Sequence, residues 1–411
     1  MGKVVYITFQ FPFGNSEVWA VNEIPALIDA GLDLIVVPRT GSGEVLHTTA
    51  LQLLPCTMKV PFINTQIVKA LMTTLLRSPA EVTKIITWIW RQSNTALDLL
   101  KGIAVLPKSL FLARMLRDQG ISHVHAYSTT SVAVVAYILA RLLRVPWSFT
   151  LHSSSIIHQG YRKSFQSHLE SAVFARAVSR KIADALVPFM GHIYADKIKV
   201  VHLGVPCENA APVPSTNKKK FAIGTPGGLL PHKGHELALK AGRLLVDQGV
   251  SNFTWHFYGE GALRASLAAR ISSMGLTEFV KLEGMIDNRE LMRLYAMGEI
   301  DVVVLPAIEE NGIHEGIPVS LMEAMSYGIP VIATDCGGIL ELIGDGAGIA
   351  VPQRDERAIA DAILRLMGDR DYFYEHGMRG RDIVIGKFNS YKNTLEMKKI
   401  FFSESGAHID E

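Results

Sequence analysis

Two glutamates in the second half of the chain, Glu315 and Glu323, are separated by seven residues and enclose a glycine and a proline. Pro318 suits the first position of a helix, because its missing N–H would have no helical partner there in any case. The helix that follows leaves free amides at its positive end, which is a ready site for an anion such as a diphosphate. These amides belong to Gly316, Ile317 and Val319.

The two carboxylates then have distinct predicted roles. Glu315, in the loop before the helix, can accept hydrogen bonds from sugar hydroxyls, and Glu323, on the helix, can accept both hydroxyls of a ribose. A bare pair at this spacing would more often be two surface residues of an amphipathic helix. Gly316, Pro318 and the apolar stretch 328–334 that follows favour the binding site instead.

A glycine-rich segment, residues 227–234, follows one predicted strand and precedes a helix. Gly227 and Gly228 permit close approach of the backbone to a ligand, and Lys233 offers a cation for phosphate oxygens. Alone, such a lysine is more often a solvated loop residue. The spacing is not that of a Walker loop. A second glycine loop, residues 259–261, adds Glu260 as a weaker candidate.

These loops need strands and helices in alternation, and the chain alternates throughout, which predicts parallel sheets covered by helices. The predicted strands of the first half are 3–9, 33–38, 123–126, 147–151, 184–187 and 199–201, with helices near 18–30 and 131–143. In the second half strands are predicted at 221–224, 254–258, 280–283, 301–305 and 330–334. Helices are predicted there at 235–248, 262–274, 289–297, 319–327 and 356–366.

A Pro- and Lys-rich stretch, residues 206–220, predicts a linker between two doubly wound domains. The predicted domains are residues 1–205 and 221–385, followed by a C-terminal helix at 386–411 that packs back on the first domain. Ligands bind at the carboxyl ends of strands in such sheets. The fold class is therefore α/β, with two Rossmann-like domains facing across a cleft that holds the ligand.

Composition excludes several classes of protein. The chain has 411 residues, of which 48% are hydrophobic, yet its best apolar run, Val132–Ala140, is far shorter than the roughly 20 residues of a membrane span. The net charge of +2 gives no nucleic-acid signal. The first residues read as a strand without a cleavage region. Three scattered cysteines suit a reducing cytoplasm, so we expect a cytoplasmic protein. They are Cys56, Cys207 and Cys336.

One segment, residues 57–117, is strongly basic and contains Trp88 and Trp90. Its only acids are Glu81 and Asp98. The bases are Lys59, Lys69, Arg77, Lys84, Arg91, Lys101, Lys108, Arg114 and Arg117. Such a segment suits a helix on an anionic membrane surface, here the inner face of the plasma membrane. The alternative is an ordinary amphipathic helix with a basic solvated face.

With these residues in view, the stretch from about Phe221 to Ile343 resembles the donor-binding domain of the retaining glycosyltransferases of family 4, which have the GT-B fold. The Glu-x7-Glu block matches the family signature, and residues 315–325 are most similar to bacterial enzymes of exopolysaccharide or lipopolysaccharide synthesis. The opening, residues 11–17, is similar to the same subgroup. The resemblance implies that Glu315 contacts the donor sugar, that Glu323 holds the ribose and that Lys233 neutralises the diphosphate.

In the first half the resemblance covers two histidines at strand ends, either of which would otherwise be read as a core histidine. It implies that His152 bonds a hydroxyl of the donor sugar and that His125, in the motif ending at Tyr127, lines the acceptor side. The early loop from Gly14 is expected to face the diphosphate and acceptor, with Glu17 and Asn22 as its polar candidates.

The implied activity is a metal-independent, hexosyltransferase-type reaction. The substrates would be a nucleotide-sugar donor and a glycan or lipid-linked acceptor, with no cofactor. No metal ligands are predicted, because Asp369-Arg-Asp371 follows a helix and reads as a solvated turn. The leaving diphosphate would then be stabilised by Lys233 and the helix end.

One departure from the family keeps an alternative open. Gly228 stands where the family has an arginine, and His232 where it has a glutamate, so a bidentate phosphate clamp is missing. His232 and the basic linker are candidate replacements for this cation. The alternative is a nucleotide-sugar-binding or partner subunit without activity of its own. A nicotinamide dehydrogenase is disfavoured, since no Gly-x-Gly-x-x-Gly follows the first strand.

Overall fold

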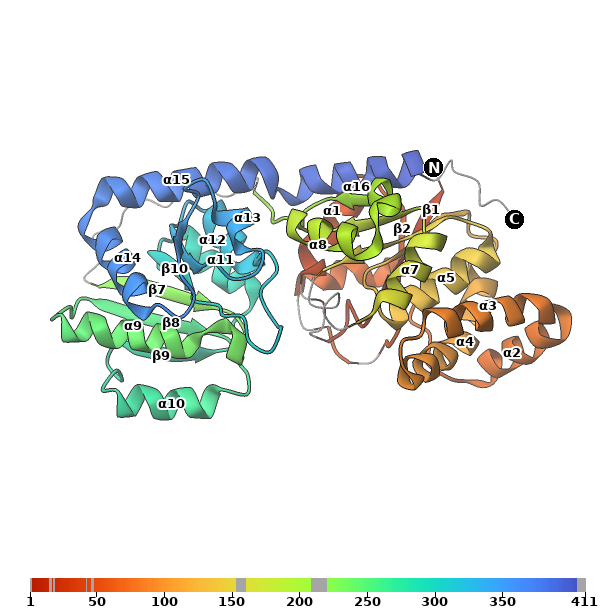
Figure 1. Ribbon diagram of the computed structural model, residues 1–411, viewed down its shortest axis with the longest axis horizontal. Helices are drawn as coiled ribbons and strands as arrows, with labels where there is room; N and C mark the ends of the chain where they lie inside the picture. Colours follow the sequence, from red (N-terminus) through yellow and green to blue (C-terminus); the bar gives the residue numbers. More distant parts are fainter. Residues whose placement is uncertain are drawn as a thin grey trace. The chain divides into compact units, whose positions relative to one another are not determined.

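The chain forms two compact units, each built around a parallel sheet (Figure 1). Unit 1 comprises Met1–His202 and Tyr391–Glu411, and unit 2 comprises Leu203–Ser390. The computed structural model describes residues 2–14, 17, 19–41, 43–45, 48–152, 160–207 and 220–404. Most of the predicted linker lies outside these residues. Unit 2 begins before that linker, because Val205 pairs with Phe388 and Ser390 and lies in the core of unit 2.

The sheet of unit 1 has the strand order β2-β1-β3-β4-β5-β6, with every pair parallel. The strands are β1 (Lys3–Thr8), β2 (Leu34–Pro38), β3 (Ile121–Ala126), β4 (Trp147–Leu151), β5 (Phe174–Ala177) and β6 (Ile198–Val200). The helices are α1 (Ala20–Asp29), α2 (Thr65–Arg77), α3 (Pro79–Gln92), α4 (Ala96–Leu116), α5 (Ser131–Leu143), α7 (Arg162–Ser171), α8 (Arg180–Met190) and α16 (Ser390–Glu404). Helices cover both faces of the central strands, so nearly every residue of β1 and β4 is buried.

The sequence prediction is wrong at two places in this sheet. The predicted strand 184–187 lies inside α8, whose start is marked by the side chain of Ser179 accepting a hydrogen bond from the amide of Ile182. The strand in this region is instead β5, which was missed because Arg176 interrupts its apolar pattern.

The last helix packs on unit 1, beside α1. Met397 and Phe401 are fully buried in its core, and Lys398 Nζ donates a 2.6 Å hydrogen bond to the carbonyl of Ala30. The helix begins at Ser390 rather than at residue 386, because α15 continues to Lys387. Packing of α16 thus joins the C-terminal segment of unit 1 to its N-terminal segment.

Unit 2 has the strand order β12-β11-β10-β7-β8-β9, again with parallel pairs. Its strands are β7 (Phe221–Pro226), β8 (Phe253–Tyr258), β9 (Val280–Gly284), β10 (Val302–Leu305), β11 (Val331–Thr334) and β12 (Ile349–Val351). The helices are α9 (His235–Asp247), α10 (Arg264–Ser273), α11 (Asn288–Ala296), α12 (Val319–Ser326), α13 (Ile339–Ile343), α14 (Glu356–Gly368) and α15 (Arg370–Lys387). Counted within the unit this order is 3-2-1-4-5-6, so the sheet changes direction between β7 and β10, where a doubly wound sheet opens its ligand crevice.

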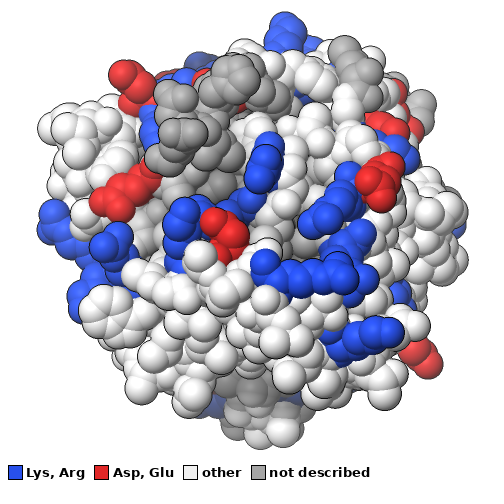
Figure 2. All heavy atoms as spheres, turned by 90° about the vertical axis from the view of Figure 1, so that its right-hand side faces the viewer, with Lys and Arg blue, Asp and Glu red and all other residues white. Residues whose placement is uncertain are grey.

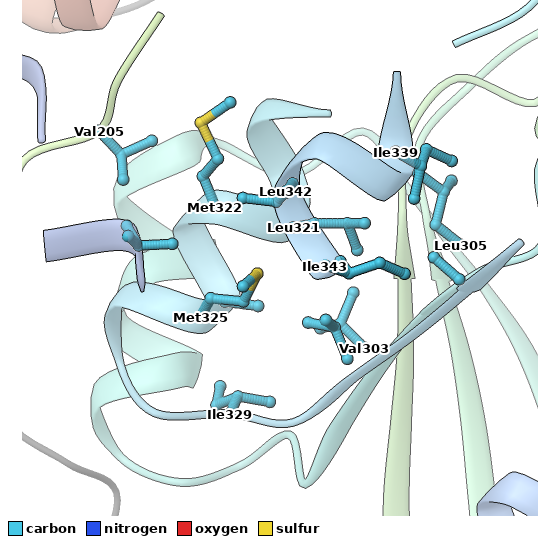
Figure 3. Close-up of a cluster of buried hydrophobic side chains, with 14 of the residues drawn as sticks. Val205, Val303, Leu305, Leu321, Met322, Met325, Ile329, Ile339, Leu342 and Ile343 are labelled. Carbon is cyan, nitrogen blue, oxygen red and sulfur yellow. The ribbon is translucent and has the colours of Figure 1, made fainter. Parts of the chain in front are cut away.

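The core beneath α12 fixes that helix against the sheet (Figure 3). Leu321, Met322 and Met325 of α12 are completely buried in the same core as Val303 and Leu305 of β10. Helices α9, α10 and α14 bury a second core on the opposite face. With its apolar side held in this way, the start of α12 is positioned at the carboxyl edge of the sheet. No helix among the described residues is long and apolar enough to span a bilayer.

Candidate active site

Two glycine loops interlock at the carboxyl ends of β7 and β8. Gly227 and Gly259 both have positive φ, at 150° and 155°, and a Cβ on Gly259 would lie 2.0 Å from the carbonyl oxygen of Gly227. A Cβ on Gly261 would lie 2.5 Å from the carbonyl oxygen of Leu229. Bare backbone is therefore required at Gly259 and Gly261, where the two loops meet.

A single helical turn, Pro231–Lys233, carries the predicted cation. It ends at Gly234, whose φ is 72° and whose Cβ would lie 1.7 Å from the carbonyl oxygen of Pro306. The amide of Ile308 donates a 2.9 Å hydrogen bond to the carbonyl of His232. The turn is thus clamped to the loop that follows β10, so the two sides of the sheet's switch point are physically joined.

That clamp brings three of the predicted side chains together. Lys233 Nζ lies 2.6 Å from Glu315 Oε1, and His232 Nε2 lies 3.6 Å from the same oxygen. All three side chains are mostly buried. Partial burial lowers the pKa of His232, and the adjacent Glu315 opposes that shift. The structure therefore places two nitrogen groups around one carboxylate at the end of β10.

The start of α12 is open, as the sequence predicts. Pro318 caps the helix with an extended backbone and no side-chain hydrogen bond. Within the part of the chain that the structure describes, no hydrogen bond is made by the amides of Val319 and Ser320. Unpaired amides at a helix start attract negative charge, so this end can bind a phosphate.

The main chain of Glu315 is held by a turn that was not predicted to matter. The carbonyl of Glu315 accepts a 3.1 Å hydrogen bond from the amide of Gly338, and a Cβ on Gly337 would lie 1.9 Å from the same oxygen. Gly337 has a φ of 60°. The Gly-Gly pair after β11 was a visible signal for such a close approach. It fixes the loop from which the carboxylate projects.

Glu323 lies one turn into α12 and is only 7% exposed. Its Oε1 accepts a 2.8 Å hydrogen bond from Asn288 Nδ2 of α11, a residue that the sequence did not single out. Burial raises the pKa of the Tyr295 hydroxyl, and the nearby charge of Glu323 adds a smaller contribution in the same direction. A half-enclosed carboxylate held by an amide is suited to accept hydroxyl hydrogen bonds.

Gly228 and Glu260 are less constrained. A Cβ on Gly228 would make ordinary contacts, at 3.5 Å to Leu230 and 3.7 Å to the carbonyl of Glu260, so this position has room for a side chain. Glu260 itself is exposed and lies 2.8 Å from Arg264. Its predicted role in donor binding stays a prediction.

In unit 1, His152 directly follows β4. Its Nε2 lies 2.8 Å from the carbonyl oxygen of Tyr127, and its ring packs between Tyr127 and Trp19 at centroid distances of 4.7 and 5.3 Å. Burial lowers its pKa to about 4. The second ring nitrogen, Nδ1, is buried and has no hydrogen-bond partner among the described residues. A neutral imidazole with one unused polar atom can bond a hydroxyl.

Two parts of the chain match families of known glycosyltransferases. Residues 208–379 match the family described as glycosyl transferases group 1, and residues 77–209 match glycosyltransferase family 4. The structure of Anabaena Alr3699/HepE in complex with UDP-glucose is similar over 98% of this chain and 100% of that one, with a TM-score of 0.71 and 16% identity. Residues 77–379 therefore match two glycosyltransferase families, and the chain has the GT-B fold.

Two curated relatives of this GT-B chain are named for polysaccharide biosynthesis. It is 32% identical over 209 residues to the putative colanic acid biosynthesis glycosyltransferase WcaL of Escherichia coli, over 50% of this chain and 51% of the relative. It is 35% identical over 186 residues to the amylovoran biosynthesis glycosyltransferase AmsK of Erwinia amylovora, over 43% of this chain and 44% of the relative. The GT-B chain thus spans about half the length of these relatives or less.

Two acceptor-side predictions for the GT-B chain do not fit the structure. His125 is completely buried, and its ring nitrogens lie 2.7 Å from Ser148 Oγ and 2.8 Å from Thr150 Oγ1 on the neighbouring strand. Tyr127 is also completely buried, with its hydroxyl donating to Glu23. Both follow from β3 being a central strand, whose side chains face covered surfaces. They are core residues and do not line an acceptor surface.

The early loop shows a similar change of role. Glu17 is 5% exposed, and its carboxylate accepts hydrogen bonds from the amides of Phe9, Gln10 and Phe11 at 2.9 to 3.2 Å. It therefore holds the loop after β1 and does not face an acceptor. Gly14 has a φ of 65°, and a Cβ there would meet the side chain of Gln10. Asn22, on α1, is half-buried, and its predicted role stays a prediction.

A buried ion pair beneath His152 was missed altogether. Arg176 and Glu23 are 1% and 5% exposed at their side chains, and Arg176 Nη1 lies 2.5 Å from Glu23 Oε1. The carboxylate also accepts from the hydroxyls of Tyr6 and Tyr127, each at 3.1 Å. A charged residue in each of two otherwise apolar elements was the available signal, since such charges are buried only when paired.

No group of three or more histidines, cysteines or carboxylates within the described ranges is close enough to hold a metal ion. Asp369 caps α15 by accepting a 2.9 Å hydrogen bond from the amide of Tyr372, whereas Arg370 and Asp371, predicted to lie in the same turn, belong to the first turn of the helix.

Proposed function

We propose that this protein transfers a hexose from a nucleoside-diphosphate sugar to a hydroxyl of a glycan or lipid-linked acceptor in the synthesis of a cell-surface polysaccharide. The observation that carries the proposal is the convergence of Lys233, Glu315 and the open start of α12 at the switch point of unit 2. The naming of WcaL and AmsK as glycosyltransferases of polysaccharide biosynthesis and the UDP-glucose in the HepE complex support the substrate class.

The proposed roles follow from the chemistry of each group. The amides at the start of α12 and the ammonium of Lys233 stabilise the negative charge that develops on the departing diphosphate. Glu315 accepts hydrogen bonds from hydroxyls of the donor sugar, and Glu323 accepts those of the ribose. In unit 1, the proposed role of His152 is to bond a sugar hydroxyl through its unused Nδ1. The proposed reaction needs no metal ion, because these cationic and dipolar groups face the phosphates.

The proposed transfer proceeds with retention. The bond between the anomeric carbon and the phosphate oxygen breaks, and the acceptor oxygen attacks the anomeric carbon from the face that the phosphate leaves. The proton of the acceptor hydroxyl passes to an oxygen of the β-phosphate, so the products are the glycosylated acceptor and a nucleoside diphosphate. Comparison of the anomeric configuration of donor and product by NMR would overturn this part of the proposal if it showed inversion.

The first experiment screens nucleoside diphosphates and their sugars by thermal shift, because a ligand that binds only the folded state raises the melting temperature. Hydrolysis and transfer are then measured with the best donor. We expect Lys233→Ala and Glu315→Ala to lower transfer by about 100-fold or more, while Lys240→Ala, at an exposed position of α9, leaves it unchanged. Unchanged transfer in the first two variants would remove the proposal.

A second candidate function is a nucleotide-sugar-binding subunit that acts only with a partner. The absence of a side chain at Gly228 favours it, because one expected phosphate contact is missing. Binding of a nucleotide sugar without hydrolysis or transfer by the purified protein, over a range of acceptors, would support this candidate over the enzyme.

A further inference from the structure

Three consecutive helices of unit 1, α2, α3 and α4, carry an unusual number of large apolar side chains on their outer surfaces (orange in Figure 1). Leu76 of α2 is 80% exposed, and Trp90 of α3 and Leu100 of α4 are each 66% exposed. The other exposed apolar residues on these helices are Val68, Met72, Leu75, Ile86, Leu97, Ile103 and Met115, and Phe62 and Ile63 lie just before α2. We call this set the apolar patch. Isolated exposed apolar residues need no explanation, but a set of this size on consecutive helices does.

The apolar side chains of α3 fall into two groups, an inner group in the core and an outer group in the apolar patch. In α3, Val82, Ile85 and Ile89 are buried, whereas Ile86 and Trp90, one turn apart, point outward. Trp88 is on the inner side, where it stacks on Tyr137 at 3.7 Å. The two tryptophans that the sequence grouped together therefore have different roles.

Basic side chains surround the apolar patch. Exposed cations on the three helices are Lys69, Arg77, Lys84, Arg91, Lys101 and Arg114. The two carboxylates of the segment are engaged: Glu81 lies 3.0 Å from Arg141 and 3.5 Å from Lys84, and Asp98 completes the capping box at Thr95. Figure 2 shows lysine and arginine side chains spread over a mostly uncharged surface on this side of the molecule, with few carboxylates among them.

One basic residue of segment 57–117 does not belong to this exposed basic surface. Lys108 is buried, and its ammonium donates to the carbonyls of Pro38, Arg39 and Val60 at 2.8 to 3.1 Å. Burial lowers its pKa to about 8. This lysine fastens α4 to the edge of the sheet, which gives the three helices a rigid attachment.

We propose that the apolar patch and its surrounding cations dock unit 1 on the surface of an anionic phospholipid bilayer. Apolar side chains that include an outward tryptophan, bordered by lysine and arginine, match the apolar interior and negative surface of such a membrane. A second copy of the chain is disfavoured as the occupant, because it would bring one basic patch against another. The docking does not depend on the proposed transfer, but if both are correct, the acceptor-binding unit works beside lipid-linked molecules.

Flotation of the full-length protein with vesicles tests the proposal without any sugar substrate. We expect binding to vesicles of phosphatidylethanolamine with about 30% phosphatidylglycerol, and at least about tenfold weaker binding to phosphatidylcholine alone. Leu76→Glu/Trp90→Glu should weaken binding to the anionic vesicles by at least about tenfold. Ile193→Glu, at a position that is 83% exposed in unit 1 but outside the patch, should leave binding unchanged.

A charge variant and a fluorescence signal separate docking from loss of fold. Lys84→Gln/Arg91→Gln should weaken binding on the order of fivefold for each residue, and added salt should reproduce the effect. Lys240→Gln/Lys281→Gln, in unit 2, should leave vesicle binding unchanged. Trp90 emission should shift to shorter wavelength on vesicles, and Trp90→Phe should remove that shift. The proposal is overturned if wild-type protein ignores anionic vesicles, if the Leu76→Glu/Trp90→Glu variant binds them normally, or if that variant only disrupts a lipid-free oligomer.

Discussion

Lys233 and Glu315 lie on opposite sides of the switch point in unit 2 and form a salt bridge, with 2.6 Å between Nζ and Oε1. The proposed function assigns them different partners, the diphosphate for the ammonium and the sugar for the carboxylate. A nucleoside diphosphate without its sugar therefore meets a cation that is already paired and a carboxylate that repels it. A nucleotide sugar offers hydroxyls to the carboxylate, so it can occupy both groups at once.

This relationship predicts that Glu315→Gln separates binding from transfer. Removing the carboxylate charge should strengthen binding of the free nucleoside diphosphate by about tenfold, because Lys233 loses its competing partner. The same change should lower sugar transfer by about 100-fold. Calorimetry with the best-bound nucleoside diphosphate, compared with Lys240→Gln, measures the first effect. Weaker binding of the diphosphate by Glu315→Gln would show that the ion pair does not compete with phosphate.

The site in unit 2 was largely predictable because its residues are close in sequence and their roles are local. Glycines after a strand and a proline before a helix act through their own backbone, and the two glutamates lie at a fixed spacing in one loop and the helix that follows it. The turn at Gly337 that fixes Glu315 was not predicted, because a contact between loops after different strands depends on the order of strands in the sheet.

In unit 1 the sequence located every strand of the sheet except β5 but misjudged side chains. His125 stands in a motif at a strand end, yet the central position of β3 buries it and pairs it with Ser148 and Thr150. The salt bridge between Glu23 and Arg176 joins two residues far apart in the chain, so local patterns could not pair them. Burial and pairing are properties of the assembled sheet.

Gly228→Arg should strengthen binding of the nucleoside diphosphate by about tenfold, since it restores a guanidinium where a side chain has room. Gly259→Ala is the matched contrast in the neighbouring loop. Its Cβ would lie 2.0 Å from the carbonyl oxygen of Gly227, so it should lower the free energy of unfolding by on the order of 3 kcal/mol. Calorimetry and urea unfolding of both variants measure the two effects. If Gly228→Arg bound no more tightly, position 228 would not face the phosphates.

Substitutions of Arg176 and Glu23 should have strongly coupled effects on the free energy of unfolding. Arg176→Met leaves the carboxylate and the carbonyls of Val201 and His202 without their guanidinium donor, and Glu23→Gln leaves a buried cation without its counter-charge. Each should lower the free energy of unfolding by about 3–5 kcal/mol. The double variant should cost clearly less than the sum, as measured by urea unfolding. Additive effects would mean that the two charges are stabilised independently.

His168 should make unit 1 sensitive to acid. Burial among Trp88, Trp147 and Phe149 lowers its pKa to about 3, and neither ring nitrogen has a hydrogen-bond partner in the described part of the chain. In the unfolded chain a histidine has a pKa near 6.5, so between about pH 6.5 and 3 the unfolded state binds the extra proton. The free energy of unfolding therefore falls as pH falls, by up to about 1.4 kcal/mol per pH unit for this residue.

The matched test is His168→Phe, which keeps an aromatic ring and removes the titration. Relative to wild type, the variant should gain roughly 2 kcal/mol of stability on moving from pH 7 to pH 5, because one and a half units of the window lie in that interval. His192→Phe, at an exposed position, should follow the wild-type dependence on pH. Urea unfolding at several pH values measures all three proteins. Parallel curves for His168→Phe and wild type would mean that the ring of His168 is protonated in the folded state, which would require a charge or water partner inside the aromatic cluster.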